Sequence, residues 1–150
     1  MANGEVHKFV GTLAGTGFAY YAARNQPDIS RVIEALGGAV GGFVGGKLPD
    51  VFDPPLHPRH RSVAHAIVPL GVAAHQCARY LQTWQETLRR FAQNEAALKT
   101  QSQDPLERIW HSMLEFAYRL ISGAIAGLIA GYASHVALDA VTPSGLPVFC

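Results

Sequence analysis

Histidine and aspartate side chains occur at four places in this sequence, in types and spacings that suit a metal ion. His135 and Asp139 lie four residues apart on an apolar segment, so both side chains fall on one face of a helix. Imidazole nitrogen and carboxylate oxygen suit zinc, and also manganese or iron. We expect one or two divalent ions, with zinc favoured, held by His135, Asp139, His7, Asp50, Asp53, His60 and His65.

Each of these groups also has a structural interpretation. His135 and Asp139 would share a hydrogen bond, the two aspartates near the prolines would cap a turn, His65 would be a hydrogen-bonded core residue, and His7 would be exposed. The combination favours a metal, because four such explanations would each have to hold independently. Three histidines on other segments are weaker candidates: His57, His75 and His111.

The chemistry that such a site supports is hydrolysis. A metal ion makes hydroxide from bound water near neutral pH and neutralises a phosphoryl or carbonyl oxygen. Asp50, Asp53 or a histidine not fully engaged by metal would be the general base. Arg61 either stabilises an anionic substrate oxygen or pairs with one of these aspartates. The sequence has no GxSxG motif, phosphate-binding loop or CxxC motif that would indicate another mechanism.

Rows of glycine lead to these residues along three expected helices. Mid-helix glycine costs roughly 0.5–1 kcal/mol relative to alanine, and close helix–helix approach is the simplest reason to accept that cost. Each row has a spacing of four and leads to a polar residue that can bind metal. The rows are Gly123, Gly127 and Gly131 before His135; Gly11 and Gly15 after His7; and Gly37, Gly41 and Gly45 beside Gly38, Gly42 and Gly46, the last pointing toward Asp50.

The pattern predicts an all-α chain, because no alternating strand pattern occurs. Helices are expected at about 5–23, at about 30–46 with Ser30 or Asp28 as the N-cap, from near Ser62 with a bend allowed at Pro69, and from Asp104-Pro105 to about residue 141. The prolines of segment 48–58 are expected to exclude regular helix there.

A single domain over 1–150 is expected to form a compact antiparallel bundle with glycine-rich packing. Short connections and up-down-up-down order would gather the expected ligands at one end. Segment 82–119 would then form a protruding amphipathic hairpin at the other end. This topology predicts that six side chains converge: His7, Asp50, His60, His65, His135 and Asp139.

Composition limits the partners. The chain is 49% hydrophobic and 15% charged, with a net charge of +1 and no basic run, which gives no support for nucleic-acid binding. Cys77 and Cys150 make no disulfide framework and are expected to be free thiols. Residues 120–138 contain no charged side chain and approach the ~20 residues that span a bilayer, so membrane lipid is an expected partner. Shorter charge-free segments suit buried helices equally well.

At these residues the sequence resembles the YdjM-type family of membrane-bound, metal-dependent hydrolases. The similarity is carried by His7, by Leu48-Pro49-Asp50, by His60-Arg61 with His65, and by the block from Gly131 to Pro147, which contains SHxxLDxxTPxG. Segment 82–119 matches nothing in that pattern. The resemblance implies an inner-membrane location, helical topology and bound metal. The order of histidine and aspartate is also similar, at the level of fold analogy, to the zinc-dependent phospholipase C and P1 nuclease group.

We therefore expect a metal-dependent hydrolase, with a small phosphoester or phospholipid-like substrate favoured. A non-enzymatic membrane or assembly protein with a structural metal site is the first alternative, and a closed coordination shell would favour it. A transporter or channel component with histidine and aspartate along an ion path is the second. A cytoplasmic location is the alternative to the membrane, and the sequence does not define an oligomeric state.

Overall fold

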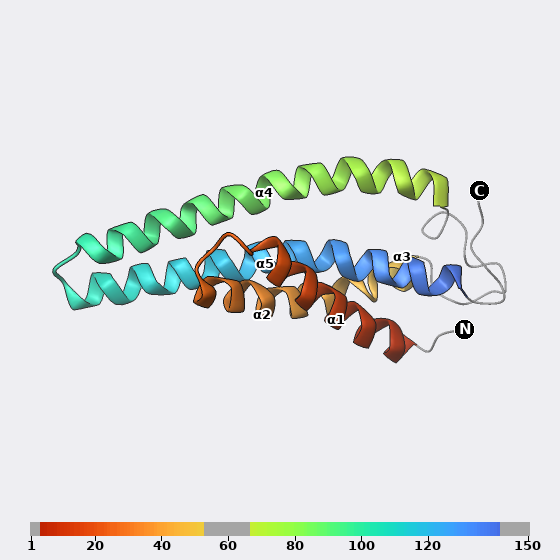
Figure 1. The fold of residues 1–150 in the computed structure, drawn as a ribbon, viewed down its shortest axis with the longest axis horizontal. Helices are drawn as coiled ribbons and strands as arrows, with labels where there is room; N and C mark the ends of the chain where they lie inside the picture. Colours follow the sequence, from red (N-terminus) through yellow and green to blue (C-terminus); the bar gives the residue numbers. More distant parts are fainter. Residues whose placement is uncertain (1–3, 53–66, 142–150) are drawn as a thin grey trace.

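Helices make up nearly all of the computed structural model, which describes residues 4–52 and 67–141 (Figure 1). No strand occurs in these two ranges, so the predicted all-α class is confirmed. The helices are α1 (Gly4–Ala22), α2 (Asp28–Gly45), α3 (Leu48–Phe52), α4 (Ile67–Gln101) and α5 (Pro105–Ala140).

The helix starts follow local chemistry, with one correction. α5 begins where predicted, and Asp104 caps it: the carboxylate accepts a hydrogen bond from the Leu106 amide at 2.8 Å, and a proline follows at the first helical position. The predicted cap of α2 was wrong, because Pro27 is the N-cap and makes no side-chain cap bond. Asp28 instead begins the helix, where its charge suits the positive end of the helix dipole, and it pairs with Arg31 at 3.2 Å.

One proline segment differs from the expectation. Leu48–Phe52 is a short helix rather than a loop, because Pro49 lies in its first turn, where an amide hydrogen has no helical partner. Pro69 lies in the first turn of α4, which continues as a single helix through Gln101. The predicted start near Ser62 lies outside the described residues.

Glycine rows set the register between the helices. A Cβ atom added at any of these positions would collide with backbone of the neighbouring helix, which confirms close approach as the reason for the rows. Between α2 and α5 the paired positions keep one constant offset, so these helices run parallel, whereas α1 runs antiparallel to α2. The pairs are Glu34–Gly123, Gly38–Gly127 and Gly42–Gly131 for α2 and α5, and Gly11–Gly42 and Gly15–Gly38 for α1 and α2.

The resulting topology is the predicted up-down-up-down order. Helices α1, α2 and α5 pack on one another, and α4 packs antiparallel along α5. The far end of the α4–α5 hairpin extends beyond α1 and α2 (Figure 1). Large apolar side chains are mostly outside this bundle, whereas the buried apolar side chains of the described residues are small: Ala19, Ala23, Ala92 and Ala126.

The seam between α4 and α5 is partly polar. His111, a weaker ligand candidate in the sequence, is half-buried and pairs at 2.6 Å with Glu95 of α4. Glu115 binds Lys99 at 2.6 Å and Arg119 at 3.0 Å. Burial alone would raise the pKa of the Glu115 carboxyl, but the hydrogen bonds and charges of these two cations outweigh burial and bring the pKa below its ordinary value.

Candidate metal centre

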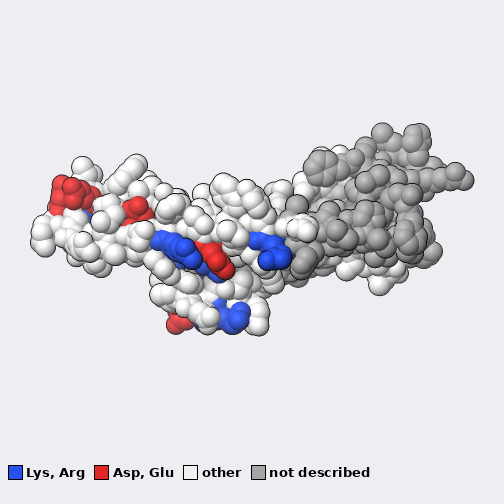
Figure 2. Space-filling model, turned by 90° about the horizontal axis from the view of Figure 1, so that it is seen from above, with Lys and Arg blue, Asp and Glu red and all other residues white. Residues whose placement is uncertain are grey.

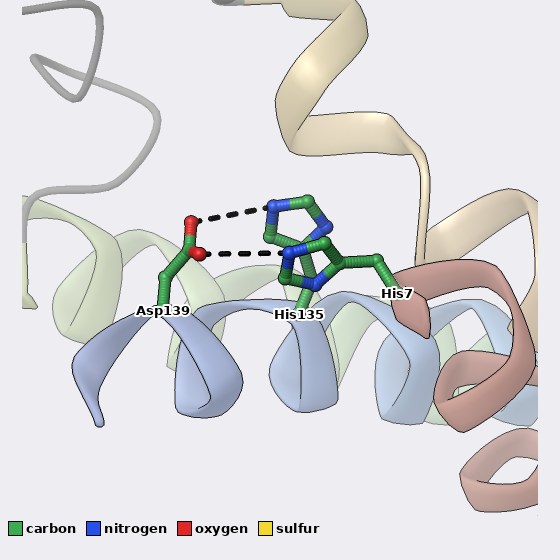
Figure 3. Close-up of side chains that lie close together, drawn as sticks. All are labelled: His7, His135 and Asp139. Carbon is green, nitrogen blue, oxygen red and sulfur yellow. Dashed lines mark ion pairs between the residues drawn. The ribbon is translucent and has the colours of Figure 1, made fainter. Parts of the chain in front are cut away.

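Three buried side chains from two helices meet where α1 begins and α5 ends (Figure 3). His7 comes from the second turn of α1, and His135 and Asp139 come from the last turns of α5. One potential ligand atom from each lies within 4.8 Å of the other two. Relative exposures of 3%, 0% and 3% place all three in the interior of the bundle.

The glycine register brings these side chains to one level. The offset that pairs Gly42 with Gly131 pairs Gly46 with His135 one turn later, and the His135 Nδ1–H donates to the Gly46 carbonyl at 2.6 Å. On the other side of α2, Gly46 lies against the backbone of His7. A carbonyl that holds one ring nitrogen fixes the tautomer and directs the other nitrogen, a common arrangement for metal-binding histidine.

Both Nε2 atoms are directed at the same carboxylate. His7 Nε2 lies 3.5 Å from one oxygen of Asp139, and His135 Nε2 lies 3.5 Å from the other. The two imidazole rings stack with their centroids 3.8 Å apart and an interplanar angle of 20°, which keeps their Nε2 edges together (Figure 3).

These separations are compatible with a shared metal ion. An N–H···O bond has a heavy-atom distance of about 2.7–3.2 Å. Two ligand atoms bound to one tetrahedral zinc ion, at about 2.0–2.1 Å each, lie roughly 3.3–3.5 Å apart. The histidine–aspartate separations are 3.5 Å, so the three side chains could hold a metal ion.

Asp50 lies beside the cluster, close to His135 but outside the group of three whose ligand atoms all lie within 4.8 Å of one another. One turn beyond Gly46 it lies on α3, and its Oδ1 is 3.5 Å from His135 Nε2. The constant offset between α2 and α5 aligns position 50 with position 139, so Asp50 continues the same register. Its side chain is 30% exposed, whereas the other three are buried. This carboxylate therefore connects the buried cluster to the outside.

The structure thus brings together four of the expected residues: His7, Asp50, His135 and Asp139. The other expected ligands and their neighbours lie outside the described residues: Asp53, His57, His60, Arg61 and His65. The Gly46 carbonyl was not predicted to orient His135, although the row from Gly38 to Asp50 pointed to it.

Sequence reasoning also missed a second buried polar group. The Glu34 carboxylate, with 0% exposure, accepts hydrogen bonds from Arg89 Nε at 3.0 and 3.1 Å and from the Ser122 hydroxyl at 3.3 Å. The Gln85 amide donates to the Ser122 carbonyl at 3.2 Å. Glu34 lies four residues before Gly38, so its place on the glycine row was the signal that it is buried.

In the described part of the chain, α5 is the one helix long and apolar enough to cross a membrane. Charged side chains are confined to a few patches on the face seen in Figure 2, and much of the described surface there is uncharged.

Comparisons with protein-family models, curated proteins and solved structures find no match to this chain.

Proposed function

We propose that this protein is a membrane-embedded, metal-dependent hydrolase whose ion is held by His7, His135 and Asp139, with Asp50 beside it. The observation that carries the proposal is the spacing of the donors: the Nε2 atoms of His7 and His135 each lie 3.5 Å from an oxygen of Asp139, a separation suited to two ligands of one ion. Two imidazoles and one carboxylate form a donor set that binds zinc, with manganese or iron as alternatives.

The position of Asp50 supports a catalytic site. Three of the donors are buried and fixed by helix packing, whereas Asp50 is partly exposed on a five-residue helix. When bound, a divalent ion lowers the pKa of coordinated water and stabilises charge on a phosphoryl oxygen. Asp50 reaches the same region from the solvent side, where a carboxylate that is not fully engaged by metal accepts a proton from water.

The outer surface of the bundle supports a place in the membrane. Charge-free stretches of α1, α2 and α5 pack side by side: 9–23, 35–46 and 120–138. Large apolar side chains on α1 and α2 are exposed, which lipid would cover: Phe9, Leu13, Leu36, Val40 and Phe43.

Aromatic and cationic side chains occur at one end of these stretches. The guanidinium groups of Arg24 and Arg31 lie 4.5 and 4.1 Å from the rings of Tyr21 and Tyr20. Tyrosine and arginine are typical of the membrane–water interface. The metal centre lies at the opposite end of the same helices, and this arrangement would place it near the other interface.

A phosphoester on a lipid or lipid-like molecule is the substrate class that this placement favours. Lys8 follows His7 in sequence, lies over the Phe43 ring at 5.9 Å and pairs with the exposed Glu5 at 2.6 Å, and Lys47 is exposed beside the Gly46 turn. Two cations beside an apolar surface suit an anionic headgroup whose acyl chains remain in the bilayer.

A structural metal site is the second candidate, favoured by the burial of His7, His135 and Asp139. Structural zinc sites are closed by four protein ligands, and Asp50 would close this one. The two candidates differ in what Asp50 does, because a ligand that only closes the site has no role in proton transfer.

The test is hydrolysis by purified protein loaded with zinc, manganese or iron, using a generic phosphodiester and a short-chain phospholipid. We expect metal-dependent turnover in the parent and in His111→Ala, whose side chain belongs to the distant hairpin seam. Asp50→Asn should lower turnover at least tenfold while retaining metal. Stoichiometric metal without turnover of either substrate in any metal form would refute the enzyme and leave the structural site.

A further inference from the structure

One face of α5 is apolar and bare where the helix extends beyond α1 and α2. Five large side chains on it, here called the distal stripe, recur at three- and four-residue steps with exposures of 46–73%: Leu106, Ile109, Trp110, Met113 and Phe116. The same steps continue to Leu120, and there the face is covered, because the Leu120 carbonyl lies against Gly37 of α2. The distal stripe is therefore the uncovered continuation of a helix-binding face.

The hairpin cannot cover the stripe by turning it inward. The opposite face of α5 is occupied by α4, through His111–Glu95 at 2.6 Å, Lys99–Glu115 at 2.6 Å and the Gln85–Ser122 bond at 3.2 Å. Rotating α5 to bury Ile109 or Met113 would break these polar pairs in a half-buried seam. The stripe consequently needs a cover from outside the chain.

Lipid is poorly placed to provide that cover. α5 is one continuous helix from Pro105 to Ala140. Since its charge-free part is residues 120–138, the stripe would stand as much as about 20 Å beyond it, at 1.5 Å per residue. The exposed side chains of Asp104, Glu107 and Arg108 surround its far end, and such charges do not enter hydrocarbon.

We infer that the distal stripe is the contact surface for a second copy of this chain. The stripe has the repeat of alternating three- and four-residue steps that packs helix on helix, and a two-fold pair presents the same repeat from both sides. Five half-exposed large side chains offer roughly 100 Å² each, so two copies would bury about 1,000 Å², the lower range for a specific interface.

A groove beside the stripe adds shape to this surface. Its volume is about 740 Å³, and Ile109, Met113 and Phe116 are among its lining residues, with Lys99 and Arg108. Trp110, on the same stripe, is 58% exposed. Tryptophan is enriched at the centres of protein interfaces, and in a two-fold pair each copy supplies both this side chain and the groove.

The test is the mass of the full-length protein in detergent, measured by light scattering over a range of concentrations. We expect a dimer in the parent. Ile109→Glu and Met113→Glu should each raise the dimer dissociation constant roughly tenfold or more, because each places a charge within the contact. Asn94→Glu adds the same charge at an exposed position of α4 that lines neither the stripe nor the groove, and it should change the dissociation constant much less.

Helical content and metal binding of each variant separate a lost contact from a lost fold, and both should equal those of the parent. A parent that stays monomeric over the whole concentration range would overturn the inference. A dimer that persists unchanged in both stripe variants would overturn it too, because the contact would then lie elsewhere. Labelling of the stripe residues in vesicles by a lipid-soluble photoreactive probe would also overturn the inference, because it would show that lipid covers them and not a second copy.

Discussion

Gly127→Ala tests how closely α5 lies against α2. The added Cβ atom would lie 2.7 Å from the Gly38 Cα atom and 2.8 Å from its carbonyl carbon, and closer still to the carbonyl oxygen. Ordinary contacts of this kind begin near 3.4 Å, so the helices must part by at least about 0.7 Å along a seam of backbone against backbone. Overpacking of this kind lowers the free energy of unfolding by roughly 1–3 kcal/mol, whereas the higher helix propensity of alanine raises it by less than about 1 kcal/mol.

A matched control is Gly17→Ala on α1, where the added Cβ atom meets nothing within 4 Å. This substitution should stabilise the protein by roughly 0.5–1 kcal/mol through helix propensity alone. In thermal unfolding followed by circular dichroism, Gly127→Ala should lower the midpoint by roughly 2–10 °C, whereas Gly17→Ala should raise it slightly. Equal shifts in the two variants would refute the register, because the row on α5 would then face lipid or solvent.

Two further predictions concern the polar groups between helices. Arg89→Met should destabilise the protein by roughly 3–5 kcal/mol, because it leaves the buried Glu34 carboxylate without its cation. Arg90→Met on the exposed face should change the unfolding free energy little. Similar losses of unfolding free energy in both variants would contradict the pairing. Glu115→Gln should lower the free energy of unfolding at neutral pH. Because the pKa of Glu115 is lowered in the folded protein, the difference in unfolding free energy between parent and variant should shrink as the pH falls below the ordinary value of 4.5 and through the folded pKa. A difference that grows as the pH falls would show that the pKa is shifted in the opposite direction.

The sequence predicted the long helices and their close approach because the decisive residues repeat. Glycine at every fourth position is most simply explained by close helix approach. With three such rows on helices in up-down-up-down order, the ends of the rows that carry the polar residues meet at the same end of the bundle. That alignment anticipates why His7, Asp50 and His135 lie together. This prediction required no knowledge of side-chain conformations, because backbone contact alone sets the position of each residue along the axis of the bundle.

Features that depend on tertiary context could not be predicted from the sequence. Pro27 rather than Ser30 caps α2, since Ser30 faces the interior of the bundle. The pairing of Glu34 with Arg89 joins residues 55 positions apart on α2 and α4, two helices that each pack on α5, and no local pattern predicts such a pair. The contact between His111 and Glu95 was missed for the same reason, because it joins two helices of the hairpin.

The most direct test of the metal centre is X-ray absorption at the metal edge, with elemental analysis of the same sample. For the parent we predict stoichiometric metal with nitrogen and oxygen ligands at about 2.0–2.2 Å, including at least two imidazoles. His135→Ala and Asp139→Ala should each lose most of the metal, and His111→Ala should retain it. Full metal occupancy in both of the first two variants would contradict the assignment and leave the pair as a structural contact.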